Sequence, residues 1–267
     1  MFAPLRQLFG SKPVAPLPAV PAGTRYYALG DIHGRLDLFE ALIDAIEADD
    51  RSASPADTTF VLLGDLVDRG PDSAGVVRRA RAWTESHGAV LLAGNHEEMF
   101  LQAFDDVSIM RHFLRHGGRE TVLSYGLPRA QFDDATFEEM QPLIAAYVPD
   151  GDIEYLRNAR DYLIAGDYVF VHAGIFPEVP IERQKAHHLR WIRDSFLDHA
   201  EPHSHFVVHG HTITDGVDHR SNRVGIDTGA YLSGRLTALV LEGTHRRTIQ
   251  AVDVDGTITI ETGTIVA

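Results

Sequence analysis

The chain contains no cysteine, which excludes disulfide bonds, thiolate metal sites and cysteine nucleophiles and is typical of a reducing compartment. It also has no apolar run near the roughly 18 residues that a membrane-spanning helix needs, so we expect no membrane span. Positive charge is scarce, since 24 basic against 38 acidic residues give a formal net charge of −14. Nucleic-acid binding requires clustered basic residues, so we expect no nucleic-acid partner. A cytoplasmic location is the default expectation.

Residues 1–24 are rich in proline and lack the apolar core of a secretory signal. We expect them to form a disordered proline-rich leader. A weak membrane-touching or partner-binding segment around residues 2–9 is the alternative. Residues 25–267 are long enough for a substantial core, and no linker divides them, so we expect one domain there.

Three short apolar runs alternate with helical patterns in the first hundred residues. The runs at 25–31, 59–65 and 88–97 predict strands. Between them, apolar residues recur at helical spacing within 36–46 and within 76–83. This βαβαβ order predicts an α/β fold with a parallel sheet covered by helices.

Residues 98–165 interrupt this order with helix-compatible stretches and few strand signals, so we expect a helical insertion that shapes the substrate groove. Strand patterns return at 167–174 and 205–212. From residue 223 onward, short β-rich runs separated by glycine predict a second, largely antiparallel or mixed sheet.

Polar residues follow five of the predicted strands, and all of them are oxygen or imidazole donors. In open α/β sheets the carboxyl ends of the strands share one crevice, so these residues can converge. Each motif alone is also compatible with an ordinary turn, but five ligand-type strand ends favour a single site. The candidates are Asp31, His33, Asp65, Asn95, His172 and His211, with His209 competing for the last position.

Six ligands exceed the needs of one tetrahedral ion and indicate two ions that share a carboxylate. Asp65 is the natural bridge between them. Two-metal sites can clamp the attacking and leaving oxygens of a phosphoryl displacement. Oxygen and nitrogen donors without sulfur suit Mn, Fe or Zn better than magnesium alone. We therefore expect two divalent metal ions, Mn²⁺ first, with Fe or Zn as alternatives.

Five motifs carry these candidate ligands, in the order GDIHG (30–34), GDLVDRG (64–70), GNHE (94–97), VHAG (171–174) and HGHT (209–212). Together they resemble the calcineurin-like metallophosphoesterases. More narrowly, they look like the bacterial and phage members of the protein serine/threonine phosphatase family. The resemblance implies a four-layer fold in which two mixed β-sheets are sandwiched together and flanked by helices, with a dinuclear metal centre above them.

The resemblance also implies an assignment of ligands. Asn95 is expected to contact the substrate phosphate as well as a metal. The family ligand in the last motif lies between glycine and threonine, which selects His211. His209 is then expected in a supporting or structural role, or as the alternative ligand. The first ion would be held by Asp31, His33 and Asp65, and the second by Asp65, Asn95, His172 and His211.

Four residues outside the ligand set receive catalytic roles by the same resemblance. His96 is expected to be the general acid that protonates the leaving oxygen, and Asp68 to orient its imidazole. Arg69 and Arg193 are expected to bind phosphate oxygens, where a guanidinium matches the geometry. The family pattern Trp-x-Arg selects Arg193 over Arg190.

The implied reaction is direct attack of a dimetal-bridged hydroxide on phosphorus, without a phosphoenzyme. The leading expectation is a metal-dependent phosphomonoesterase, most of all a protein serine/threonine phosphatase, with a phosphorylated protein or a small phosphoester as substrate. Diadenosine tetraphosphate hydrolase is the runner-up. Asp68 disfavours it, because in that family the second motif resembles ARG at the positions where this chain has DRG (68–70). A catalytically silent, metal-stabilised binding protein is the alternative from another class.

The roles of two further stretches stay open. Arg111, Arg115 and Arg119 flank a glycine pair and could approach an anionic substrate, or form a solvated loop. Asp227 and Tyr231 could return near the site, but Asp-Thr-Gly after a strand is typical of a turn. We leave both out of the catalytic set.

Overall fold

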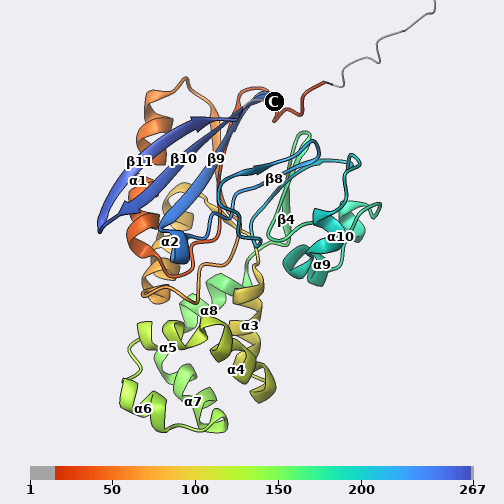
Figure 1. Ribbon diagram of the computed structural model, residues 1–267. Coiled ribbons are helices and arrows are strands. Elements are labelled where there is room, and N and C mark those ends of the chain that lie inside the picture. Colours follow the sequence, from red (N-terminus) through yellow and green to blue (C-terminus); the bar gives the residue numbers. More distant parts are fainter. Residues whose placement is uncertain (1–15, 266–267) are drawn as a thin grey trace, which may run out of the picture.

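The computed structural model describes residues 16–265 and contains two mixed β-sheets (Figure 1). The first sheet has six strands in the order β11-β10-β9-β1-β2-β3. In it β1, β2 and β3 run parallel, whereas β9, β10 and β11 are joined by antiparallel pairing, with β9 beside β1. The strands are β1 Thr24–Leu29, β2 Asp57–Leu62, β3 Val90–Leu91, β9 Arg235–Glu242, β10 His245–Val254 and β11 Thr257–Thr264.

The second sheet has five strands in the order β4-β5-β6-β8-β7. Its centre, β5, β6 and β8, is parallel, and the two edge strands pair antiparallel. The strands are β4 Tyr162–Ala165, β5 Tyr168–Val171, β6 Phe206–His209, β7 Asp218–His219 and β8 Arg223–Gly225.

The C-terminal strands do not form the second sheet that their local pattern predicts. Only β8 belongs to the second sheet, and β9–β11 extend the first one beyond β1. β9 is buried on both faces for most of its length, as a central strand should be. The expectation for 223 onward was wrong because glycine-separated β-runs reveal strands but not which distant strand each one pairs with.

Helices cover the outer face of each sheet, which completes the predicted four-layer architecture (Figure 1). On the first sheet, α1 (Leu36–Ser52) and α2 (Ser73–His87) each bury one apolar face. α2 begins where the Asp72 carboxylate accepts the Gly75 N–H at 2.7 Å, and it ends at Gly88 in the left-handed conformation. Short helices α9 (Ala186–Trp191) and α10 (Asp194–Leu197) pack on the second sheet.

A separate apolar layer fills the space between the two sheets. It joins side chains from the first sheet and its strand ends with side chains from the second, including Ala28, Val61, Leu63, Phe170, Val208 and Ile226. Because the layer lies directly beneath the ends of the parallel strands, it fixes those ends against one another.

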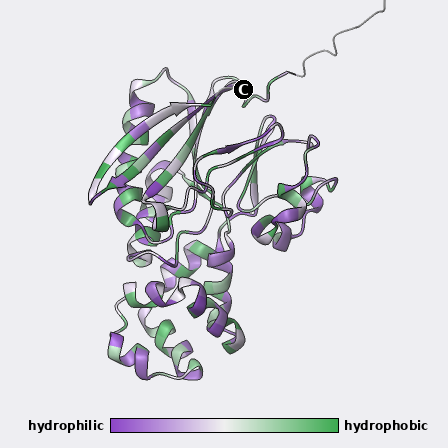
Figure 2. Ribbon diagram, viewed as in Figure 1, coloured by the Kyte–Doolittle hydropathy of each residue, from purple (hydrophilic) through white to green (hydrophobic). Residues whose placement is uncertain are grey.

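The insertion forms a helical lobe that extends away from the sheets, in the lower part of Figure 1. Its helices carry hydrophobic and hydrophilic residues side by side (Figure 2), and the buried ones join the core of the first sheet. The predicted range 98–165 is helical except at its end, where β4 forms an edge of the second sheet. The helices are α3 Asn95–Ala103, α4 Val107–Phe113, the π-turn η1 Leu114–Gly118, α5 Arg119–Ser124, α6 Arg129–Asp134, α7 Phe137–Tyr147 and α8 Asp150–Arg157.

Two further short helices lie in loops, the 3₁₀ turn η2 Ile181–Arg183 beside the second sheet and α11 Ala230–Ser233 beside β9 of the first sheet. Of the predicted leader, residues 1–15 lie outside the described residues, and 16–23 lie against the domain. Val20 is buried and its N–H donates to Gly243 O at 3.0 Å, while Ala19 O accepts the Asp167 N–H at 3.0 Å. No helix within residues 16–265 is long and apolar enough to cross a bilayer.

Candidate active site

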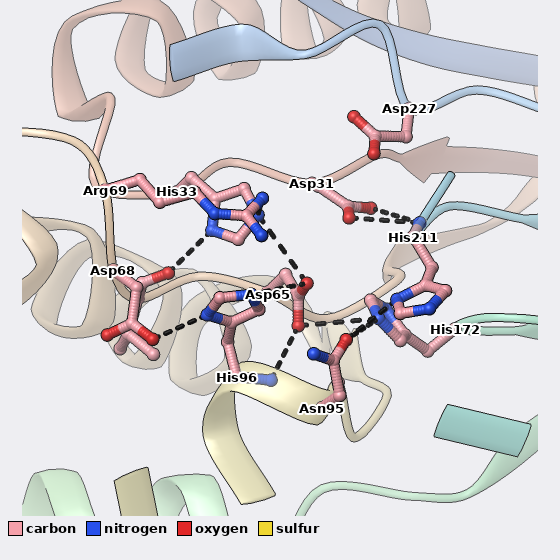
Figure 3. Close-up of polar contacts among 12 residues, drawn as sticks. Asp31, His33, Asp65, Asp68, Arg69, Asn95, His96, His172, His211 and Asp227 are labelled. Carbon is pink, nitrogen blue, oxygen red and sulfur yellow. Dashed lines mark hydrogen bonds and ion pairs between the residues drawn. The ribbon is translucent and has the colours of Figure 1, made fainter. Parts of the chain in front are cut away.

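The predicted ligands meet at the carboxyl ends of strands from both sheets (Figure 3). All of them are at least nine-tenths buried. The parallel strands of each sheet end at the same edge, and the packed sheets bring the two edges together. Asp31 and His33 follow β1, Asp65 follows β2, Asn95 follows β3, His172 follows β5 and His211 follows β6.

Backbone strain is concentrated at this site. Seven residues other than glycine have positive φ within residues 16–265, and five of them belong to the predicted set. Residues with side chains rarely adopt this conformation, which persists only where surrounding contacts over-determine it. The five are His33, Asp65, Asp68, Arg69 and His211, with φ between 46° and 75°.

His33 and Asp65 form the first potential metal group, together with His96. The His33 Nδ1–H donates to Val67 O at 2.8 Å, which leaves a lone pair on Nε2, 3.6 Å from Asp65 Oδ2. Burial lowers the pKa of His33 to about 3, so the ring is neutral. A neutral imidazole whose free nitrogen faces a carboxylate is the form that binds a metal ion.

Asp65, His172 and His211 form the second group. The His172 Nδ1–H donates to Leu63 O at 2.8 Å, so the neutral ring has only a lone pair on Nε2. That lone pair faces two oxygens that are also acceptors, Asn95 Oδ1 at 2.9 Å and Asp65 Oδ1 at 3.4 Å. The His96 backbone N–H donates to Asp65 Oδ1 at 3.0 Å, and His211 Nδ1 lies 2.8 Å from Asn95 Oδ1. Within residues 16–265 the lone pair of His172 Nε2 faces these two acceptors without a donor of its own, an arrangement that a cation would stabilise.

Buried negative charge gives a second reason why this site fits cations. Burial raises the pKa of Asp31 well above its ordinary value, and the neighbouring Asp227 and Asp65 carboxylates raise it further. Burial also raises the pKa of Asp227 to about 6, and its Oδ2 finds no hydrogen-bond partner within residues 16–265. Burial raises the pKa of Asp65, but the histidines around it, among which His96 holds its proton most firmly, lower it overall. Divalent ions would offset this crowding of carboxylates.

His96 and Asp68 form a closely hydrogen-bonded pair at the edge of the first group. Asp68 Oδ2 accepts the His96 Nδ1–H at 2.5 Å, which leaves Nε2 facing the site, 4.0 Å from Asp65 Oδ2. Burial lowers the pKa of His96, but the Asp65 and Asp68 carboxylates raise it above its ordinary value overall. The ring therefore holds a proton more firmly than a free histidine.

The two predicted arginines lie on opposite sides of the site. Arg69 donates from Nη1 to His33 Nε2 at 2.8 Å, and its guanidinium lies 4.9 Å from the centre of the Tyr231 ring. Arg193 is exposed, and its Nη2 lies 3.5 Å from His211 O. Arg190 instead forms ion pairs with Glu98 and Asp161, outside the site.

His209 does not join either group. Its ring packs edge-on against Phe196, and its Nδ1–H donates to Gly210 O at 3.0 Å. Burial lowers the pKa of this histidine to about 4. The structure thus places the ring below the ligands, within the packing of the second sheet.

Sequence reasoning missed the carboxylate that shapes the central turn. Glu97 accepts the N–H groups of Asp65, Leu66 and Gly94 at 2.8, 2.7 and 3.1 Å. It thereby fixes the backbone that carries Asp65 beside the N-terminus of α3. The available signal was the glutamate of GNHE at the third position of a helix, where it can reach back to backbone N–H groups.

The arginines of the loop at 111–119 separate in the structure. The guanidinium of Arg111 lies over Phe137 and that of Arg119 over Phe132, both within the insertion. Arg115 is exposed. The loop reaches the site through its backbone, because Gly117 O accepts the Arg69 N–H at 3.1 Å.

The family model for calcineurin-like phosphoesterases matches residues 24–234. The chain therefore belongs to the calcineurin-like phosphoesterase family, whose members are metal-dependent phosphoester hydrolases. The fold and the resemblance predicted from the motifs are thereby confirmed.

Curated relatives carry two kinds of activity in their names. A symmetrical bis(5′-nucleosyl)-tetraphosphatase of Paracidovorax citrulli is 32% identical over 177 residues, 65% of this chain and 48% of the relative. The chain thus spans about half the length of that relative. Serine/threonine-protein phosphatase 2 of Escherichia coli is 26% identical over 223 residues, 79% of this chain and 90% of the relative.

A solved structure shows the same fold. The cold-active protein-tyrosine phosphatase of a psychrophilic Shewanella species superposes with a TM-score of 0.57 at 18% identity, covering 91% of this chain and 83% of that one. At this identity the likeness concerns the fold alone.

Proposed function

We propose that this protein is a metal-dependent phosphomonoesterase whose preferred substrates are phosphorylated serine and threonine side chains of proteins. The observation that carries the proposal is the 2.5 Å hydrogen bond between His96 and Asp68, beside the two groups of potential ligands. An oriented general acid matters most when the leaving oxygen is strongly basic. Serine and threonine alkoxides are strong bases, whereas a departing nucleoside diphosphate is a weak one.

The metal assignment follows the predicted ligand set. The first ion would be held by Asp31, His33 and Asp65, and the second by Asp65, Asn95, His172 and His211. The converging lone pairs and the crowded carboxylates support two divalent cations, for which Mn²⁺ is our first choice and Fe or Zn the alternatives. When bound, such ions activate water for attack on phosphorus and offset the charge of the phosphoryl oxygens.

The residues of the chain then divide the remaining work. Arg69 and Arg193 bind phosphate oxygens from two sides, with Asn95 between them. Arg69 now donates to His33 Nε2, and an ion at that nitrogen would displace the guanidinium and free it for phosphate. His96 delivers its Nε2 proton to the leaving oxygen, while Asp68 retains the proton on Nδ1. The insertion is placed to form one wall of the substrate groove, since its backbone contacts Arg69.

Hydrolysis of dinucleoside polyphosphates is the second candidate. The observation in its favour is the 32% identity to a symmetrical tetraphosphatase, which exceeds the identity to the serine/threonine phosphatase. Both reactions need the same ions and the same phosphate-binding arginines. They differ in the basicity of the leaving group, and therefore in how much they depend on His96.

The test is a comparison of kcat/KM on a phosphoserine peptide, p-nitrophenyl phosphate and diadenosine tetraphosphate, with Mn²⁺ and after chelation. We expect the peptide to be preferred over the dinucleotide, and no turnover without metal. His96→Asn should lower turnover of the peptide by roughly 10²–10⁴ while both ions remain bound. A preference for the dinucleotide would support the second candidate. Inactivity on all three would leave the silent, metal-stabilised binding protein.

A further inference from the structure

His96 and Asp68 are called the acid pair below. The helical insertion contacts this pair through one buried side chain, that of Thr121. It lies in the first turn of α5 and is fully buried. Its Oγ1 lies 2.6 Å from Asp68 Oδ1 and 2.8 Å from Asp68 N. The Ser73 Oγ lies 3.1 Å from Thr121 Oγ1. Asp68 and Thr121 are 53 residues apart in the sequence, so this contact exists only in the folded insertion.

The hydrogens of this cluster can be assigned from its chemistry. A hydroxyl has one proton and two lone pairs. Because the Asp68 N–H is a donor, Thr121 Oγ1 accepts there, and its own proton goes to Asp68 Oδ1. Ser73 Oγ accepts the same N–H at 3.0 Å and lies 3.1 Å from Thr121 Oγ1, so the remaining lone pair of Thr121 has the Ser73 hydroxyl as its partner. Thr121 is therefore fully hydrogen-bonded without any other partner.

Each oxygen of the Asp68 carboxylate thereby has one defined side-chain donor, Thr121 for Oδ1 and His96 for Oδ2. Two donors on different oxygens fix the rotation of a carboxylate, which a single donor cannot do. The backbone of Asp68 is held as well, since its φ of 75° is strained and its N–H is bound by Thr121 and Ser73.

We propose that Thr121 is a positioning residue for the reaction, whose hydroxyl fixes Asp68 so that Asp68 aims the His96 proton at the leaving oxygen. This inference rests on the function proposed above. In the step concerned, the oxygen of the attacking water forms a bond to phosphorus, and the P–O bond of the ester breaks with its electron pair on the leaving oxygen. That oxygen takes the proton from His96 Nε2, while the Nδ1 proton stays hydrogen-bonded to Asp68.

The leaving group supplies a readout that a merely structural role would not change. A serine alkoxide cannot leave without a proton, whereas p-nitrophenolate is a much weaker base and leaves with little help. A badly aimed acid therefore slows hydrolysis of the peptide more than hydrolysis of p-nitrophenyl phosphate. Loss of folded enzyme or of metal slows both equally.

The test compares Thr121→Val, which removes the hydroxyl at similar volume, with Thr121→Ser, which keeps it. Ser124→Ala is the matched control, because Ser124 also links α5 to α2, accepting the Ala74 N–H at 3.0 Å, without touching Asp68. We expect Thr121→Val to lower kcat on the phosphoserine peptide about tenfold more than on p-nitrophenyl phosphate, with little change in KM. Thr121→Ser should restore the wild-type ratio, and Ser124→Ala should keep it.

A second measurement needs no metal and no turnover. In metal-free protein, the His96 Nδ1–H should give a far-downfield proton resonance that disappears in His96→Asn. Thr121→Val should shift or broaden this resonance and Thr121→Ser should keep it; Thr121→Ala serves if valine disrupts the fold. A wild-type ratio and resonance in Thr121→Val, or equal effects of Ser124→Ala, would overturn the inference. Inactive wild-type enzyme would instead contradict the proposed function, and the resonance would still test Thr121.

Discussion

The two sheets contribute unequally to the candidate site. The strand ends of the first sheet carry both acidic residues of the predicted ligand set, the pair of His96 and Asp68, and Arg69. Those of the second sheet carry only His172 and His211 from the predicted ligand set. Even these two residues are held by the first sheet, since the His172 ring donates to Leu63 O and the backbone N–H of His211 donates to Asp31.

The difference extends to the supporting contacts. On the first sheet, Glu97 binds the turn at Asp65, and Thr121 and Gly117 bind the turn at Asp68 and Arg69. His209, the corresponding buried polar side chain at the end of β6, has only its neighbour's carbonyl as a hydrogen-bond partner among residues 16–265. The first sheet thus organises the site, and the second completes it. Changes on the first sheet should accordingly have the larger effects.

The largest effect is expected at Asp65, which belongs to both ligand groups. Asp65→Asn should release both ions and lower kcat/KM by about 10³ or more, since metal ions contribute several kcal/mol to transition-state stabilisation. His172→Ala, on the second sheet, should release one ion only. Metal analysis of the purified variants checks both. Two ions retained by Asp65→Asn would show that this carboxylate is not shared.

Replacing Arg69, which follows a strand of the first sheet, should lower kcat/KM more than replacing Arg193, which lies beside the second sheet. Arg69 is partly buried and fixed by Gly117 and Tyr231, whereas Arg193 is exposed. A pre-positioned donor loses less entropy on binding phosphate, and hydrogen bonds between charged groups contribute about 1.5–3 kcal/mol. We expect kcat/KM to fall about a hundredfold in Arg69→Ala and about tenfold in Arg193→Ala. Equal losses, or the reverse order, would contradict the unequal roles of the sheets.

The unequal contributions of the two sheets to the site could only partly be predicted from the sequence. The strand ends with their ligand-type residues are local patterns, and for that reason the metallophosphoesterase family and the set from Asp31 to His211 could be inferred. The support of the first sheet is not local. The contact of Thr121 with Asp68 depends on how the insertion folds back, and the pairing of β9 with β1 joins residues about two hundred positions apart.

The open stretches show the same limit. Nothing in the sequence separates Arg111, Arg115 and Arg119. The structure does separate them, because it packs Arg111 and Arg119 on aromatic rings of the insertion. Asp227 reads as part of a turn, and its Oδ1 does accept the Gly229 N–H at 2.9 Å. Only the packing of the two sheets brings its carboxylate near that of Asp31 (Figure 3).

The smallest effect is expected on the outer face of the second sheet. Burial, His199 and Arg223 lower the pKa of His203 from 6.5 to about 4. The unfolded chain therefore binds this proton at higher pH than the folded one, and stability is lost as pH falls from 6.5 toward 4. For a half-buried ring this amounts to about 1 kcal/mol after discounting for solvent.

His203→Phe keeps a ring stacked on Phe196 but cannot take up the proton. We expect its free energy of unfolding, measured by urea denaturation, to fall less between pH 6.5 and 4 than that of the wild type. Its kcat on p-nitrophenyl phosphate near neutral pH should be unchanged. A loss of turnover would show that this face of the second sheet contributes to the site after all.

The most direct test of the account is anomalous diffraction from crystals grown with Mn²⁺. We expect two peaks about 3.5–4 Å apart, as in other two-metal sites, with the Asp65 carboxylate between them. One peak should lie beside Asp31 and His33, and the other beside Asn95, His172 and His211. A single peak, or a peak coordinated by His209 or by His96 Nε2, would contradict the proposed centre.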